Sequence, residues 1–187
     1  LFRSNSLATA RDQLSGCGVQ TSAVAIGGKV SAAVSNLTEE FDGTNWSSGG
    51  TLNTVRHRLA SAGLSSPSVM AFGGATGTSP SGVQSAVTEI YNGSAWTAGN
   101  AMSRGAGTAG TGFGIQTAGI YATGNVSGSA STLVEQYSEQ AVLQAGEAKG
   151  QIIAQEYQKA AETRVKAIED DSAAYVYSHY PDLVELN

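Results

Sequence analysis

The sequence predicts a mainly β protein with a C-terminal α extension: four-stranded antiparallel units, two full and one partial, followed by a long helix. One observation is a change of composition at residue 131. Residues 1–131 hold 22 of the 24 glycines with 6 basic and 5 acidic residues, whereas residues 132–187 hold 4 basic and 10 acidic residues. Short runs rich in Gly, Ser and Thr are typical of strands and tight turns, and Ala, Glu, Gln and Lys favour helix. We therefore predict a β-repeat region over 1–131 and a helical segment, for oligomerisation or attachment, over 132–187.

The second observation is an internal repeat of roughly 45–50 residues, the length of one four-stranded unit. The segment from Phe41 to Trp46 aligns with the segment from Tyr91 to Trp96. A third copy begins well but ends at Tyr137 without a Trp. The predicted repeats are about 7–51, 52–101 and 102–137. An apolar run closed by two glycines precedes each of the first two aromatic segments, at Gly27, Gly28, Gly73 and Gly74.

The strands follow from this pattern. The first repeat predicts strands near 14–19, 22–27, 35–41 and 45–48, and the second near 60–64, 68–73, 86–91 and 95–98. Asp42-Gly43 and Asn92-Gly93 are hairpin signals, and we expect type I′ turns there, with positive φ at both central residues. The glycine pairs are expected where the backbone turns sharply beside a neighbouring strand.

An apolar strand, Gly-Gly, an aromatic residue about 15 positions later and a Trp about five further on resemble the kelch repeat. Arg11 and Arg56, ahead of the first strand, fit the same pattern. The low charge and the many small residues resemble the kelch-like repeats of marine bacteriophage tail-fibre and appendage proteins. This resemblance implies propeller blades, of which a closed ring usually needs about 4–8. A second copy of the chain, giving a six-bladed ring, an upstream segment, the C-terminal segment or a trimeric arrangement are alternative ways to cover the open ends.

The C-terminal segment shows apolar residues at spacings of mostly three or four, which indicates an amphipathic helix. A coiled coil with other copies and packing on the chain's own blades both remain open. Residues 169–172 look like the end of one helix and the start of a short aromatic helix that Pro181 stops. The candidate partner-docking residues are Tyr175, Tyr177, Tyr180 and Leu183.

The composition argues against several functions. The formal net charge of −5 argues against nucleic-acid binding, and no apolar run reaches the ~20 residues that a membrane helix needs. One Cys and two His leave little for a metal centre or a nucleophilic triad. We predict no enzyme activity, no catalytic, metal-binding or cofactor-binding residues, and no cofactor. His57, between Arg56 and Arg58, is expected to be exposed. Cys17 is expected to be a small buried residue, as is Phe113 at the matching place of the third repeat.

Repeat-fixed residues are predicted to be structural. The aromatic residues Phe41, Trp46, Tyr91, Trp96 and Tyr137 are expected to pack between blades rather than to bind a ligand. Glu39, Glu89 and Glu135 occupy equivalent or nearly equivalent places, and we expect them to pair with Arg11, Arg56 or Arg104.

The function that these features predict is a structural subunit of a bacteriophage virion appendage, either a tail fibre or a decoration protein. The expected partners are further copies of the chain, as a trimer before a dimer, and other virion proteins, with the virion as the location. The alternative is a propeller-type binding module or scaffold, extracellular or cytoplasmic. It would recognise a surface glycan or protein through loops at 29–36, 75–84 and 123–132. The first residue, Leu1, suggests a processed chain or a piece of a longer one.

Overall fold

The structure is a computed structural model, and it describes residues 5–78, 82–105, 110–126 and 129–179. The chain divides into two compact units, Leu1–Glu139 and Gln140–Asn187. The first unit contains the strands and the second most of a single helix. The two units are described separately.

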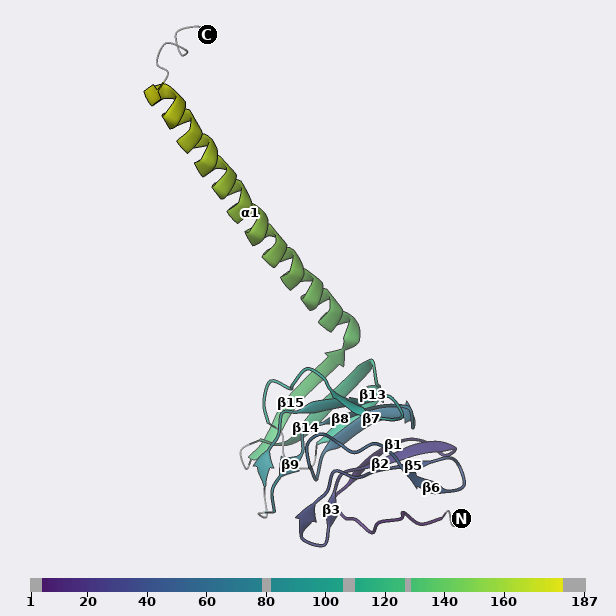
Figure 1. The fold of residues 1–187 in the computed structure, drawn as a ribbon. Helices are drawn as coiled ribbons and strands as arrows, with labels where there is room; N and C mark the ends of the chain where they lie inside the picture. Colours follow the sequence, from purple (N-terminus) through teal and green to yellow (C-terminus); the bar gives the residue numbers. More distant parts are fainter. Residues whose placement is uncertain (1–4, 79–81, 106–109, 127–128, 180–187) are drawn as a thin grey trace. The chain divides into compact units, whose positions relative to one another are not determined.

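Two four-stranded antiparallel sheets follow the first two repeats (Figure 1). Sheet 1 has the order β1-β2-β5-β6 and sheet 2 the order β7-β8-β11-β12. Their strands are β1 (Ser15–Val19), β2 (Ser22–Ile26), β5 (Thr38–Phe41) and β6 (Trp46–Ser48), then β7 (Ala60–Ser65), β8 (Ser68–Phe72), β11 (Thr88–Tyr91) and β12 (Trp96–Ala98). The strand positions that the repeat predicts are confirmed to within a few residues.

Each of these sheets is interrupted at its glycine pair. Gly27 and Gly28 have φ values of 61° and 98°, and Gly73 and Gly74 have 55° and 89°. These are left-handed conformations that other residues rarely adopt. The chain then leaves the sheet and forms a small two-stranded hairpin before it returns. The hairpins are β3 (Lys29–Val30) with β4 (Ala33–Val34), and β9 (Ala75–Thr76) with β10 (Val83–Gln84).

The two hairpins at Asp42-Gly43 and Asn92-Gly93 are present, but the predicted type I′ turn is wrong. Gly43 has a φ of 96° and Gly93 a φ of 91°, whereas the residues after them do not have positive φ. Glycine at the first central position is the type II′ pattern. The Asp42 Oδ1 atom also accepts hydrogen bonds from the Thr44 and Asn45 N–H groups, at 2.8 and 2.7 Å. This Asx-type bonding supplies part of the turn that a second positive φ would otherwise supply.

The third repeat forms a three-stranded sheet, sheet 3, of β13 (Thr111–Ile115), β14 (Ala118–Val126) and β15 (Ser129–Ser138). The prediction that the helical segment begins at residue 132 is therefore wrong, because residues 132–138 belong to β15. Their side chains alternate: Leu133, Glu135 and Tyr137 are half-buried, while Val134 and Gln136 are exposed. This period of two suits a strand, and pairing with β14 satisfies its backbone groups. Helix-favouring composition over seven residues does not outweigh that pairing.

The core lies between successive sheets. One buried cluster joins Val24 and Ile26 of sheet 1 to Val69, Tyr91 and Trp96 of sheet 2. A second cluster joins the other side of sheet 2 to sheet 3, and its members include Ala60, Ala62, Met70, Phe72 and Tyr121. Sheet 2 is thus packed on both sides, which leaves one side of sheet 1 and one side of sheet 3 without a neighbouring sheet among the described residues.

Helix α1 (Glu139–His179) has 41 residues, and at 1.5 Å per residue it is about 60 Å long. It runs unbroken through residues 169–172, so the predicted helix end there is wrong. Asp and Ser favour helix starts, but the segment contains neither Gly nor Pro to interrupt the hydrogen-bond ladder. The side chains of residues 147–168 are exposed along the whole length.

Candidate functional site

The repeat positions define two faces on every sheet. We call the side toward the next sheet along the chain the front face and the side toward the preceding sheet the back face. In sheet 1 the front face carries Cys17, Val24, Ile26, Thr38 and Glu40, because these residues lie opposite one another in register or pack in the first core cluster. The back face of sheet 2 carries Val69, Ala71, Glu89, Tyr91 and Trp96.

The interface between sheets 1 and 2 combines apolar packing with a buried polar network. The Tyr91 hydroxyl donates to the Glu40 carboxylate and accepts from the Gly50 N–H at 3.0 Å. Trp96 Nε1–H donates to Thr38 Oγ1 at 2.9 Å and to the Gly50 carbonyl at 3.0 Å. Burial, together with the bond to Glu40, raises the pKa of Tyr91 to about 12. Tyr91 and Trp96 therefore link the two sheets while their rings stack, with centroids 4.8 Å apart.

An Arg–Glu pair braces each of the first two sheets where the glycine pair opens it. Arg11 Nη2 lies 3.0 Å from Glu39, and Arg56 Nη2 lies 2.9 Å from Glu89. The expected pairing is thus present in both sheets. Arg56 Nη1 also donates to the carbonyls of Gly73 and Val87, at 2.9 and 2.7 Å. The guanidinium occupies the place where the two central strands diverge, and it satisfies carbonyls that the ladder leaves open.

The third sheet lacks this brace, and the expected role of Arg104 is wrong. Glu135 instead accepts bonds from the Ser103 N–H and hydroxyl, at 2.7 and 2.9 Å. Glu39 and Glu89 accept the matching bonds from the Ala8 and Asn53 N–H groups. In the first two repeats the Arg lies three residues after this N–H donor, and in the third repeat that position is residue 106, an Ala.

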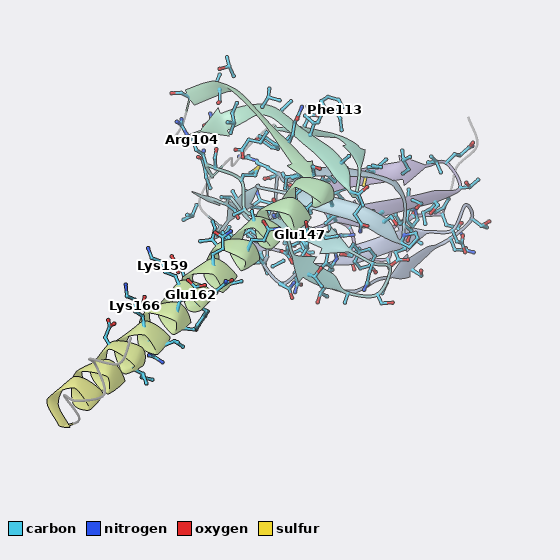
Figure 2. All side chains as sticks on the ribbon, turned by 90° about the horizontal axis from the view of Figure 1, so that it is seen from above. Arg104, Phe113, Glu147, Lys159, Glu162 and Lys166 are labelled. Atoms are coloured by element: carbon cyan, nitrogen blue, oxygen red, sulfur yellow. The ribbon has the colours of Figure 1, made fainter. Side chains whose placement is uncertain are left out.

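Sequence and structure agree on why the third sheet can do without an arginine. The glycine pair is replaced by Thr123-Gly124, and β14 and β15 continue as one long hairpin. Because the two strands do not diverge, their carbonyls bond to each other across the ladder. Arg104, which Figure 2 labels, lies two residues too early for the bracing position.

The interface between sheets 2 and 3 is more apolar. Ile90 takes the position of Glu40, and Tyr137 takes that of Tyr91, so apolar packing replaces the hydroxyl–carboxylate bond. Tyr121 is 2% exposed, and its hydroxyl makes no hydrogen bond to the residues that the structure describes. Burial raises the pKa of Tyr121.

The two outermost faces expose residues whose equivalents are buried elsewhere. On the back face of sheet 1, Phe41 and Trp46 are half-buried, whereas Tyr91 and Trp96 are 0% and 4% exposed. On the front face of sheet 3, Val134 is 58% exposed, whereas Thr38 and Thr88 at the same place are 2% exposed. Phe113 is 55% exposed, so its predicted burial is wrong (Figure 2). The position is buried only where a next sheet covers it.

His57 is fully buried, and its predicted exposure is wrong. It occupies the place of Asp12 in the first repeat, and its backbone bridges to Ala75 of β9, which encloses the ring. Its Nδ1 atom lies 2.9 Å from Gln13 Oε1. Burial lowers the pKa of His57, and the positive charges of Lys29 and Arg58 lower it further against smaller opposing effects of Gly77 and Asp12. A neutral, enclosed imidazole is a structural residue here.

Cys17 is half-buried against the first core cluster. Burial raises the pKa of its thiol to about 11, against the smaller effect of a hydrogen bond with Ser61, so the unreactive thiol form dominates at neutral pH. Among the described residues, no three His, Cys, Asp or Glu side chains are grouped as a metal site. None of the helices built from those residues is long and apolar enough to cross a membrane.

The predicted docking residues are only partly described. Tyr175 and Tyr177 lie within α1, and Tyr180 and Leu183 lie outside the described residues. The residues that sequence reasoning missed are those of the uncovered front face, Val134 and Gln136, together with Glu40 and Thr38. Strand alternation combined with the repeat alignment would have found them.

The fold places the chain among proteins built from successive antiparallel β-sheets. Among solved structures it is similar to YjhT, a kelch-type β-propeller, with a TM-score of 0.59 and 17% identity. The match covers 72% of this chain and 44% of the YjhT chain, so the chain corresponds to less than half of that protein. No family model matches the sequence, and no curated protein does.

Proposed function

We propose that the chain is a non-catalytic structural subunit of a multi-copy assembly. In this proposal sheets 1 and 2 are full kelch-like blades, sheet 3 is a partial blade, and α1 is the segment that joins copies. The interiors of the sheets support a structural role, because their charged side chains are engaged in Arg–Glu pairs and inter-sheet hydrogen bonds.

The observation that carries the proposal is the apolar stripe of α1. Ile153, Tyr157, Val165 and Ile168 are 53%, 75%, 55% and 68% exposed. With Ala161 they recur at spacings of four, four, four and three, which places them along one side of the helix. Lys159, Glu162 and Lys166 lie along the opposite side (Figure 2). An isolated helix of this kind gains little stability alone, and burying the stripe between copies would supply it.

The assembly that fits best is a bacteriophage virion appendage, either a tail fibre or a decoration protein. Charged residues are only 13% of the chain, small residues dominate the β repeats, and the helix is far longer than a small domain needs. The proposed partners are further copies of the chain, as a trimer before a dimer, and other virion proteins.

The test of helix-mediated assembly is the native mass of the full chain beside two single variants. Ile153→Lys places a charge on the stripe and should lower the mass toward the 19.0 kDa of one chain. Ile152→Lys is the matched control, since Ile152 is equally apolar and 56% exposed but lies on the charged side. Equal behaviour of the two variants, or a monomeric parent chain, would refute the role of α1.

The virion role has its own test. Purified particles of the source phage should contain the chain at a fixed copy number, and antibodies against it should label the tail or the capsid surface. Failure to find the chain in washed particles would reject this location and leave the assembly role standing.

A binding module is the second candidate, and the hairpins that leave sheets 1 and 2 favour it. β3–β4 and β9–β10 leave the sheets at equivalent places but differ in length and sequence. A constant frame that carries variable hairpins suits recognition of a surface glycan or protein. Binding of the full chain on a glycan array, lost on replacing 29–34 with Gly-Ser repeats, would support it. An array without signal would count against glycan recognition.

A further inference from the structure

We propose that the front face of sheet 3 in one copy packs on the back face of sheet 1 in a second copy, and that two copies close a ring of six sheets. The inference rests on the interpretation of the sheets as propeller blades in the proposed function. It concerns a different surface from α1, so the two proposals can fail separately.

The front face of sheet 3 has the features of a contact that lacks its partner. Its exposed residues Phe113 and Val134 flank half-buried Ile120. Val134 occupies the position of Thr38 and Thr88, both of which become 2% exposed when the next sheet covers them. An apolar residue left exposed at a position that is buried twice in the same chain indicates an interface.

The back face of sheet 1 already has the geometry of the matching surface. Phe41 and Trp46 stack with centroids 5.1 Å apart and planes inclined at 35°. Tyr91 and Trp96, which pack against sheet 1, stack at 4.8 Å and 31°. The aromatic pair that docks sheet 2 on sheet 1 is thus present on sheet 1 with no described sheet in front of it. Because front and back faces are complementary twice within the chain, the same pairing between copies needs no new kind of contact.

The occupant that fits is a second copy of this chain. A front-to-back contact is heterologous, so it makes either a closed ring or an open filament. Propellers close with about 4–8 blades, and six is the one multiple of three in that range. The solved kelch-type propeller to which the chain is similar is matched over 44% of its length, which leaves room for roughly one further equivalent unit.

Equivalence also identifies the side chains that meet. Within the chain, Glu40 meets Tyr91 and Ile90 packs near Tyr137, one polar and one apolar combination at the same place. Between copies this place pairs Gln136 of sheet 3 with Phe41 of sheet 1. The inner strands are complementary in size as well, because Phe113 would lie against the strand of Gly16 and Gly18, which carry no side chains.

The sharpest test rebuilds the internal contact between copies. Gln136→Glu alone should weaken dimerisation of the full chain by about tenfold or more, because the carboxylate would be covered by Phe41 without a donor. The double variant Gln136→Glu/Phe41→Tyr should recover most of that loss by recreating the Glu40–Tyr91 bond. Sedimentation over a range of concentrations measures both. A double variant no better than Gln136→Glu alone would overturn the pairing.

A second pair of variants separates this face from α1. Val134→Glu should abolish the ring contact, whereas Val83→Glu, on β10 and 72% exposed, should leave it intact. Loss of association in Ile153→Lys together with an unaffected Val134→Glu variant would reject the ring and retain the helix role. The reverse result would support the ring and reject the helix. If Val134→Glu lowers the Tm of a strictly monomeric chain instead, the face is covered by the chain itself and the second copy is refuted.

Discussion

Equivalent carboxylates in the three sheets show how one residue position is supported in different ways. Glu39 and Glu89 each accept a backbone N–H and pair with a buried arginine, while Glu135 keeps the N–H contact and adds a Ser hydroxyl. The arginine is present only where the glycine pair separates the central strands. Its main contribution is therefore to carbonyls and a carboxylate that would otherwise be buried without partners.

Arg56→Ala should be strongly destabilising, because Glu89 is 1% exposed and would remain as an uncompensated buried charge. We expect a loss of about 3–5 kcal/mol in the free energy of unfolding. Arg104→Ala, at a position that is not buried, should change it by less than about 0.5 kcal/mol. Chemical denaturation of both variants beside the parent chain measures the difference. A small effect of Arg56→Ala would contradict the bracing role.

His57 should make the β unit sensitive to acid. Its folded-state pKa is lowered from 6.5, so the unfolded chain takes up the proton first as the pH falls. The stabilisation is complete above about pH 6.5 and is lost as the pH falls toward the folded-state pKa. Thermal unfolding between pH 7.5 and 5 should show a smaller decline for His57→Gln than for the parent. Identical slopes would show that the ring does not stay neutral in the fold.

At the scale of elements, the glycine pairs explain why sheets 1 and 2 emit a hairpin and sheet 3 does not. A Cβ at Gly28 would lie 2.6 Å from the Asp12 carbonyl oxygen, and its φ of 98° is unfavourable for any side chain. In α1, a Cβ at Gly150 would meet nothing within 4 Å. The same residue type is thus required in one element and only tolerated in the other.

Gly28→Ala and Gly150→Ala should therefore change stability in opposite directions. We expect Gly28→Ala to destabilise the β unit by more than about 1 kcal/mol, from strain and from the close carbonyl. Gly150→Ala should favour the helix by about 1 kcal/mol, since Ala has the higher helix propensity. Near-UV circular dichroism follows the first variant and far-UV helicity the second. A neutral Gly28→Ala would mean that the hairpin exit can relax.

The spacing of the α1 stripe also bears on how helices would associate. Ile153 and Ile168 are fifteen residues apart over four steps, about 3.75 residues per step, which is wider than the 3.5 of a heptad. A bundle through this stripe would be straight or slightly right-handed. The register also explains why Arg164 interrupts a heptad alignment of the same segment.

At the scale of the whole molecule, two association surfaces on separate units predict a characteristic pattern of masses. Val134→Glu and Ile153→Lys act on the β unit and on the helix, so each should remove one kind of contact and leave the other. The double variant should be a monomer of 19.0 kDa. Native mass spectrometry of the four chains checks this. A double variant no smaller than the smaller single variant would show that only one surface operates.

The sequence by itself determined the local elements. The repeat, the alternation and the Asp42-Gly43 and Asn92-Gly93 signals placed eight strands correctly, because these depend on backbone preferences and on neighbours a few residues away. The tertiary structure decided what depends on distant partners. Pairing with β14 made residues 132–138 a strand, β9 buried His57, and the absence of a described next sheet left Phe113 exposed. Burial is a property of a position in the assembly of sheets, so the residue type alone does not determine it.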